Sequence, residues 1–400
     1  FHTCQLLAGE LFPDEVFTNS GLTGRQMQAK AKNMLYDWFV TFRKEGFTEW
    51  NSSPYLPIDT LGFGSLYAFA QDPAMRELGR EGMDFAYYLL AVHSQQGIFA
   101  SSSGRTYIKE QFGNWSNCPS GLSWIGYGYG VPGHAGKGIT SYCLSDYEPP
   151  KEFAQWFSIP RGKEMICQTT QGNDGYVDLY TYKTADYMMT SANDFHPGEP
   201  GHQENPFQLT FNAVAQLWVT HPGERVLFGA ARPSYWAGNG TLPKVNQYKA
   251  FAGLIYDIAP EHPVDFTHLY LPSMEFDRCE VEGKWAFVQL GSAYAAVYCS
   301  NGMRMQDFGS NKDRECIAEG RRCIWLVRAA QADEFAAFED FKAAMRGAAL
   351  DADAEGRRYR FVDPVYGELR CQWGETLYVN DAPMQYSGFD NYGKLTMQEK

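Results

Sequence analysis

Arg105 and Tyr107 are residue types that can transfer a proton together, and they lie two positions apart in the string GRTY. A phenol has an ordinary pKa of about 10 and is a poor base near neutrality unless a cation stabilises its phenolate. In an extended segment, side chains two positions apart face the same way. The spacing therefore predicts that guanidinium and phenol converge, although Tyr107 is only one of 25 tyrosines.

His202, in the string GHQEN, is a second candidate for proton transfer because an imidazole titrates near working pH. With Glu204 and with His196, six residues earlier, it could instead hold a structural zinc ion. The spacing H-x5-H-x-E matches no strong ligand signature, so we expect no cofactor, with this zinc as the alternative. His268 falls within an expected strand, which favours a hydrogen-bonded core histidine.

Glu49 and Asp59 are the nearest acidic residues around one loop, and a pair of carboxylates can hydrolyse a glycosidic bond. Asn51 lies between them. It follows Trp50 and precedes Ser52, a pattern that is also typical of a helix start, so its amide is either functional or a structural cap.

The first part of the chain has the 3.6-residue periodicity of helices. From 24 to 47, apolar residues form one face, and Gly46 suits a left-handed helix end. Further helices are expected through 66–69 and over 74–93. Helices joined by short loops pack as antiparallel hairpins, so we expect α/α hairpins in a first domain, residues 1–160.

Gly, Ser, Tyr and Pro dominate residues 100–160, and long irregular loops in compact proteins are usually functional. From 161 to 400, segments with alternating or β-branched and aromatic residues follow one another, separated by turns. One helix is expected near 332–348. A single core rarely exceeds about 250–300 residues. We therefore predict an α+β, two-domain chain whose second domain, 161–400, is a large antiparallel β-sandwich.

The net charge of −13 opposes binding to nucleic acid and to anionic membranes. A polyanionic substrate would need a local basic pocket. No apolar run reaches the ~18 residues that span a bilayer.

The chain has nine cysteines and no Cys-x-x-Cys pair, which favours free thiols in a reducing compartment and hence the cytoplasm. The first residue is Phe1 rather than Met, so we expect that N-terminal sequence is missing. If it included a leader, a periplasmic or secreted location is the alternative.

Several strings resemble the heparinase II/III-type polysaccharide lyases: FTEWNSSPY (47–55), GRTY (104–107), YKTADYMMTS…GHQENPFQLTF (182–211), WAFVQLGSAYAAV (285–297) and EFAAFEDFKAAM (334–345). The resemblance implies an α/α toroid followed by a β-supersandwich. The helical part is too short to close a toroid, so a missing N-terminal segment or a homo-oligomer is expected to complete it.

The resemblance also implies roles. Asn51 matches the residue that neutralises a uronate carboxylate, Tyr107 matches the catalytic tyrosine, and His202 matches a histidine across the cleft. Arg105 would help to hold the carboxylate. Ser52 stands where the family often has a histidine, so His93 is the alternative base.

Aromatic side chains make up 16% of the residues, and they suit either sugar-stacking walls or an aromatic core. We predict that the following residues contact the substrate: Trp50, His93, His134, Tyr127, Tyr129, Tyr235, Trp236 and Glu204.

The leading hypothesis is a carbon–oxygen lyase that cleaves a uronic-acid-containing polysaccharide or oligosaccharide by β-elimination. One alternative is a carbohydrate-binding relative without catalysis. The other is a glycoside hydrolase that uses paired carboxylates, with Glu49 as its main candidate.

Overall fold

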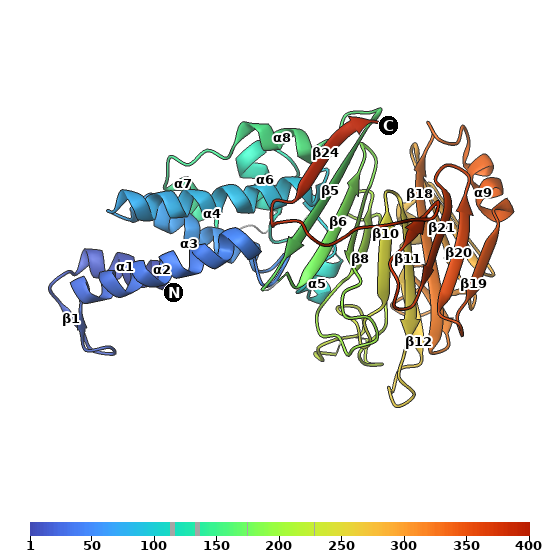
Figure 1. Ribbon diagram of the computed structural model, residues 1–400, viewed down its shortest axis with the longest axis horizontal. Helices are drawn as coiled ribbons and strands as arrows, with labels where there is room; N and C mark the ends of the chain where they lie inside the picture. The colour runs from blue at the N-terminus through green and yellow to red at the C-terminus, as the bar shows by residue number, and fades with distance from the viewer. Residues whose placement is uncertain (113–116, 133–136, 174, 228) are drawn as a thin grey trace.

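A computed structural model describes residues 1–400 apart from 113–116, 133–136, 174 and 228. The chain folds into helices followed by stacked antiparallel sheets (Figure 1). The helices cover one face of a nine-stranded sheet, and a six-stranded sheet covers its other face. The fold is therefore of the mixed α+β kind.

The first helices pack in pairs, α1 against α2 and α3 against α4. Helix α2 begins with a capping box between Thr23 and Gln26 and ends at Gly46, whose φ of 66° suits glycine. Its buried face includes Phe39 and Phe42. Trp38, expected on that face, is instead 41% exposed. The bounds are α1 His2–Leu11, α2 Gly24–Glu45, α3 Leu56–Phe69 and α4 Pro73–Val92, with a small hairpin of β1 Val16–Phe17 and β2 Leu22–Thr23.

Helix α4 connects the helical layer to the sheets. Asp72 caps its first turn, and every residue from Phe85 to Val92 is buried. A short hairpin and several short helices follow as the chain passes through the irregular region predicted from the sequence. They are β3 Ser94–Gln95, β4 Ile98–Phe99, α5 Ile108–Gln111, α6 Ser120–Tyr127, α7 Ile139–Cys143, η1 Lys151–Phe153 and α8 Ala154–Phe157.

The nine-stranded sheet has the order β16-β17-β12-β9-β8-β7-β6-β5-β24. All its pairs are antiparallel, so neighbours in sequence can pair through short turns. The bounds are β5 Lys163–Gln171, β6 Val177–Lys183, β7 Met188–Asn193, β8 Phe207–Thr210, β9 Gln216–Thr220, β12 Phe266–Tyr270, β16 Arg304–Met305, β17 Glu315–Glu319 and β24 Lys394–Glu399.

The six-stranded sheet, with the order β10-β11-β18-β15-β14-β13, shares one apolar core with the nine-stranded sheet. Tyr182 and Leu209 of the larger sheet lie in the same buried cluster as Leu254 and Val297 of the smaller one. The bounds are β10 Lys244–Tyr248, β11 Phe251–Asp257, β13 Arg278–Glu282, β14 Trp285–Leu290, β15 Ala293–Cys299 and β18 Arg322–Gln331, with η2 Ser273–Glu275 before β13.

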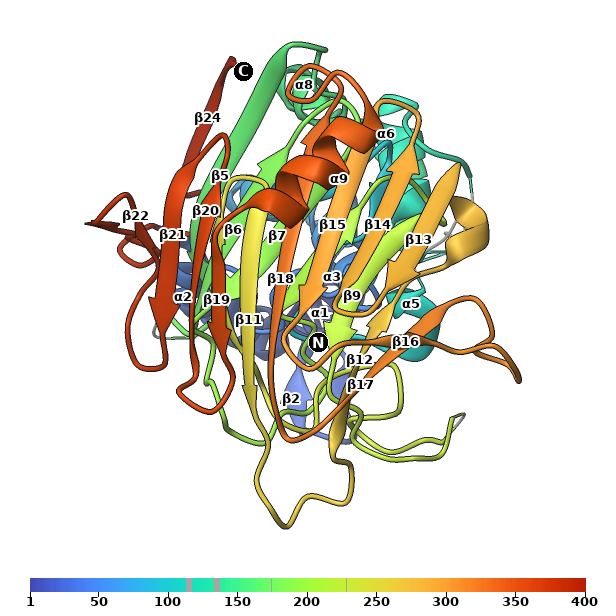
Figure 2. The same ribbon diagram turned by 90° about the vertical axis from the view of Figure 1, so that its right-hand side faces the viewer.

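A five-stranded sheet and helix α9 pack on the outer face of the six-stranded sheet (Figure 2). Phe251 stacks on Phe361 with 5.7 Å between ring centroids, and Tyr294 stacks on Phe341. The expected helix is thus present but shorter than 332–348. The bounds are α9 Phe338–Gly347, β19 Leu350–Asp353, β20 Arg358–Asp363, β21 Gly367–Gln372, β22 Tyr378–Val379 and β23 Ala382–Pro383.

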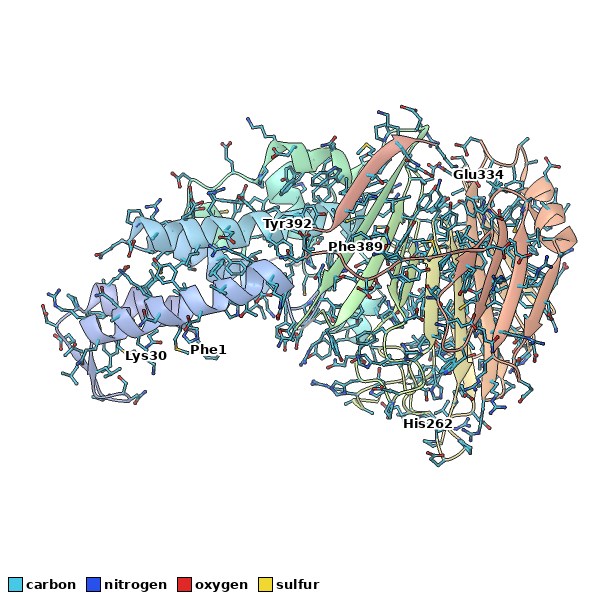
Figure 3. The ribbon with its side chains drawn as sticks, viewed as in Figure 1. Phe1, Lys30, His262, Glu334, Phe389 and Tyr392 are labelled. Atoms are coloured by element: carbon cyan, nitrogen blue, oxygen red, sulfur yellow. The ribbon has the colours of Figure 1, made fainter. Side chains whose placement is uncertain are left out.

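The C-terminal segment runs back from this sheet to the helical layer, which the sequence did not predict. Tyr392 lies beside helix α4 (Figure 3), where its ring contacts Phe85 and Tyr88. Asn391 donates to the backbone oxygen of Phe42, and β24 pairs with β5. One segment therefore joins the sheets and the helices.

The predicted strands and helical hairpins are present, with α8 ending at Phe157 and β5 beginning at Lys163. A division into two domains and a partial α/α toroid stay predictions. Among the described residues, no helix has both the length and the apolarity to cross a membrane. Each of the nine cysteines is a free thiol, and five of them are buried.

Candidate active site

Four loop segments meet where the helical layer joins the nine-stranded sheet. Residues 101–107 run between the loop after α2 and the loop before β8. Gly104 donates its backbone N–H to Trp50, Thr106 donates to Gln203, and Ser103 forms a β-bridge with Asn205. These backbone bonds fix the path of the GRTY segment, which bends at Gly104 and Arg105, so Arg105 and Tyr107 have defined positions.

Arg105 and Tyr107 converge, as their spacing predicts. The guanidinium lies 3.4 Å from the Tyr107 hydroxyl and 3.5 Å from the Tyr55 hydroxyl, and it forms a 2.8 Å ion pair with Glu49. The hydrogen bond from Arg105 is the largest cause that lowers the pKa of Tyr107. The charge of Arg232 lowers this pKa further. The phenol is therefore a stronger acid than an ordinary tyrosine.

Arg232 contacts Tyr107 through its side chain and His202 through its backbone. Its guanidinium lies 5.2 Å from the centre of the Tyr107 ring, a cation–π contact. Its backbone oxygen lies 3.1 Å from His202 Nδ1. Because a carbonyl oxygen only accepts, Nδ1 carries the hydrogen, and Nε2 of the neutral ring is left as a proton acceptor. His202 is exposed, whereas Tyr107 is half-buried.

A cavity of about 460 Å³ opens beside Tyr107, within the usual size range of ligand pockets. Among the described residues that line it, Lys109 and Arg232 are basic and none is acidic. Lys109 is paired with Glu110 at 3.0 Å, so in a protein of net charge −13 the local positive charge that suits an anionic ligand comes mainly from Arg232. The lining residues are Thr106, Tyr107, Ile108, Lys109, Gln203, Gly229, Ala230, Ala231, Arg232, Ser234 and Ala237.

Asn51 lies outside the lining of this cavity. It is 3% exposed, and its amide nitrogen donates to the backbone oxygen of Ser102 at 3.3 Å. Its φ of 47° is in the left-handed region, which asparagine adopts more readily than most residues. The structure thus brings the side chains of Arg105 and Arg232 to Tyr107, connects His202 to the Arg232 backbone, and places the Asn51 amide in an adjacent polar cavity.

A second pocket, of about 230 Å³, contains both Glu49 and Asp59. Burial and the negative charge of Glu49 raise the pKa of Asp59 to about 7. At neutral pH a large share of Asp59 is therefore protonated beside the Glu49 carboxylate, which Arg105 pairs. Trp38 lines this pocket with its exposed indole.

Three of the predicted substrate contacts are aromatic side chains buried in the protein. Trp50 and Trp236 are each 1% exposed and pack against Phe195 and His268, respectively. Tyr235 is 8% exposed and donates to Glu315 at 2.6 Å. Such side chains have no free face for a sugar ring, so in this structure they stabilise the fold.

His93 is also buried, at 1% exposed, and its Nδ1 lies 3.0 Å from the Thr181 hydroxyl. Burial, with a smaller effect of the Lys183 charge, lowers its pKa to about 3. A neutral, enclosed imidazole cannot reach a substrate as the alternative base.

Of the remaining predicted contacts, Tyr127 and Tyr129 are half-buried in the helical layer and pack against Phe157. The Glu204 carboxylate accepts the backbone N–H of His202 at 2.5 Å, so it positions that loop. His134 lies outside the described residues.

Among the described residues, no three His, Cys, Asp or Glu side chains are grouped so that they could hold one metal ion. His196 contacts Glu199 at 3.4 Å, and the suggested zinc stays untested. His268 is a core histidine, as predicted, because both ring nitrogens have partners, Thr220 and Glu315.

Sequence reasoning did not predict that Tyr55 contacts Arg105 or that Arg232 contacts Tyr107. Both are brought to Tyr107 by tertiary packing. The raised pKa of Asp59 could not be predicted from the sequence either, because it depends on burial and on the charge of Glu49.

No family model matches the chain, and no curated protein matches it either. Among solved structures, the heparan sulfate lyase HepC from Pedobacter heparinus is similar, with a TM-score of 0.44 and 10% sequence identity. The match covers 96% of this chain, which spans 66% of the length of that lyase. At this level of similarity, the case for function comes from the chain's own side chains.

Proposed function

We propose that the chain is a lyase that cleaves a uronic-acid-containing glycan by β-elimination in the cavity beside Tyr107. The observation that carries the proposal is the position of the Tyr107 phenol between two guanidinium groups, those of Arg105 and Arg232. The basic lining of the cavity suits a carboxylate-bearing sugar.

β-Elimination first requires that the uronate carboxylate lose its effective charge, because the proton on the adjacent carbon is otherwise too weakly acidic. We assign this role to Arg232, which lines the cavity and can bind a carboxylate with two hydrogen bonds. Asn51, which the resemblance implies for this role, is sealed from the cavity by its own contacts.

His202 Nε2 is the proposed base, since its ring donates from Nδ1 to the Arg232 backbone. It takes the proton from the carbon next to the carboxylate as a carbon–carbon double bond forms and the bond to the departing oxygen breaks. Tyr107 donates its proton to that oxygen, and Arg105 stabilises the resulting phenolate. The imidazolium then returns a proton to the phenolate through solvent.

The test is incubation of the protein with alginate, pectate, hyaluronan and heparan sulfate. An unsaturated product absorbs in the near ultraviolet, so new absorbance that disappears in Tyr107→Phe is the expected result. Exposed Tyr36, on helix α2, gives the matched control variant Tyr36→Phe. Binding of a polymer without any new absorbance would favour the alternative of a carbohydrate-binding relative.

A hydrolase is the second candidate because one pocket contains a carboxylate, Glu49, and a carboxyl with a pKa of about 7, Asp59. This pairing of an ionised and a protonated group is what glycoside hydrolysis uses. Hydrolysis would release saturated reducing ends and depend on both groups. Glu49→Gln and Asp59→Asn would abolish it, whereas Asp37→Asn, at an exposed position of α2, would not.

A further inference from the structure

A small polar cavity lies next to the GRTY segment. Its volume is about 20 Å³, enough for one small ion or one water molecule, which needs roughly 10–15 Å³. Thr106 lines both cavities. The described lining residues are Asn51, Ser53, Phe99, Ala100, Ser101, Ser103, Thr106, Glu110, Gln111, Asn205 and Gln208, none of them basic.

Five of these residues have a buried side-chain oxygen atom without a hydrogen-bond partner among the described residues. Each of the five residues is at most 5% exposed. Burying so many unpaired acceptors in one place is costly, and native structures rarely tolerate it. The atoms are Asn51 Oδ1, Thr106 Oγ1, Glu110 Oε2, Gln111 Oε1 and Asn205 Oδ1.

Hydrogen bonds determine which end of each amide is the free oxygen. Gln216 Nε2 donates to the backbone oxygen of Ala213, which leaves Gln216 Oε1 to accept from Gln208 Nε2. Gln208 Oε1 therefore accepts, from Gln111 Nε2 at 3.3 Å and from Asn205 Nδ2 at 2.9 Å. The carbonyl oxygens of Gln111 and Asn205 are thus the atoms left over.

The same argument applies to Asn51, whose Nδ2 donates to the backbone oxygen of Ser102. Glu110 adds a negative charge, and only one of its oxygens is engaged, with Lys109 Nζ at 3.0 Å. One water molecule can donate two hydrogens and would leave most of these acceptors unpaired. A cation can be coordinated by all of them.

We propose that this cavity is a binding site for a hard metal cation of about the size of calcium, coordinated by these five oxygen atoms. An all-oxygen set of carboxylate, amide and hydroxyl ligands is what calcium prefers, whereas zinc prefers nitrogen and sulfur. Magnesium usually retains several waters, for which a cavity of about 20 Å³ has no room. Sodium has a similar size and is the monovalent ion to compare.

The ligands come from three parts of the chain, and this gives the ion a structural role. Asn51 belongs to the loop after α2, Asn205 precedes β8, and Thr106 and Glu110 flank Tyr107. A bound cation would tie these segments together and hold the Tyr107 backbone in place. It would do so without contact with the substrate.

The experiment uses the whole chain after dialysis against a chelator. Terbium, whose luminescence is excited by nearby aromatic rings, serves as the probe for calcium, and thermal unfolding is followed with added calcium chloride or sodium chloride. We expect one terbium per chain, displaced by calcium, and a rise in Tm with the preferred ion. A rise with sodium alone would identify a monovalent site of the same oxygen chemistry.

Two variants test the ligands. Glu110→Gln should abolish the ion-dependent rise in Tm, whereas Glu261→Gln, at an exposed position without an ion pair among the described residues, should retain it. Thr106→Val keeps the side-chain shape, removes one ligand oxygen, and should weaken binding about tenfold. If Glu110→Gln does not fold, the ion-dependent rise in Tm of Thr106→Val still tests the proposed site.

Two results would overturn the proposal. The first is no response of the unmodified chain to terbium, calcium or sodium, which would mean that the cavity holds water alone. The second is an ion response that is the same in Thr106→Val and Glu110→Gln as in the unmodified chain, which would place the ion elsewhere.

Discussion

The guanidinium of Arg105 lies 3.4 Å from the hydroxyl of Tyr107, and the same guanidinium forms an ion pair with Glu49. One cation is therefore shared between the phenol at the larger pocket and the carboxylate at the smaller one. A change at Arg105 therefore removes a charged partner from Tyr107 and from Glu49 together.

Replacing Arg105 with Gln should move the pKa of Tyr107 up toward its ordinary value, because the largest cause of its lowering is removed. Arg105→Lys should restore part of the effect, since an ammonium keeps the charge but lacks the planar fork that reaches Glu49, Tyr55 and Tyr107 together. The measurement is a ¹³C NMR titration of the tyrosine rings, with the Tyr107 signal assigned by its loss in Tyr107→Phe. An unchanged Tyr107 titration in Arg105→Gln would show that Arg105 does not control this phenol.

For the proposed lyase, Tyr107→Phe should lower kcat by roughly 10²- to 10⁴-fold, the usual contribution of a positioned acid. KM should change little, because the ring and its cation–π contact with Arg232 remain. Steady-state rates of double-bond formation give both parameters. A loss expressed only in KM would assign Tyr107 to binding rather than to proton transfer.

Asp59→Asn should stabilise the protein at alkaline pH. The folded pKa of about 7 lies above the ordinary value of 3.8, so stability associated with this group is complete below about pH 4 and is lost as pH rises toward 7. We expect the variant to exceed the unmodified chain by up to about 4 kcal/mol at pH 8 and by little at pH 4. Urea unfolding at the two pH values measures this, and an equal difference at both would contradict it.

Asn51→Ala should destabilise the fold, by about 1–3 kcal/mol in the presence of a chelator. The variant loses the bond to the Ser102 backbone and forces alanine into the left-handed region at φ 47°. Asn51→Gly loses the same bond without the backbone strain, so it should be less destabilised than Asn51→Ala. Equal stability of all three proteins in urea would mean that Asn51 has no structural role.

His93→Asn should reduce the acid sensitivity of the fold. The buried imidazole has a pKa of about 3, below the ordinary 6.5, so its contribution is present above pH 6.5 and is lost as pH falls toward 3. Between pH 7 and 4 the unmodified chain should lose roughly 2–3 kcal/mol through this group. His221, whose pKa burial also lowers to about 3, continues to contribute in the variant.

Chemical denaturation across this pH range provides the measurement for His93→Asn. His196→Asn is the control, because the side chain of His196 is 37% exposed. If both variants lose stability on acidification as steeply as the unmodified chain, His93 does not cause the acid sensitivity of the fold.

Local patterns predicted the elements well. The apolar period and Gly46 gave helix α2 and its end, and alternation gave the strands of the two large sheets. The convergence of Arg105 and Tyr107 could be predicted from their spacing, since they lie two positions apart with one residue between them. The C-terminal segment had no such signal, because its position depends on partners as distant as Phe42 and Cys167.

The sequence by itself determined the helices, the strands and the residue types available for chemistry, because these depend on steric and apolar preferences of neighbouring residues. Only the tertiary structure decided that Asn51 and Trp50 are buried, that Arg232 contacts Tyr107, and that Glu49 raises the pKa of Asp59. Burial and electrostatic environment are set by groups that packing brings from elsewhere in the chain, and spacing along the chain carries little information about them.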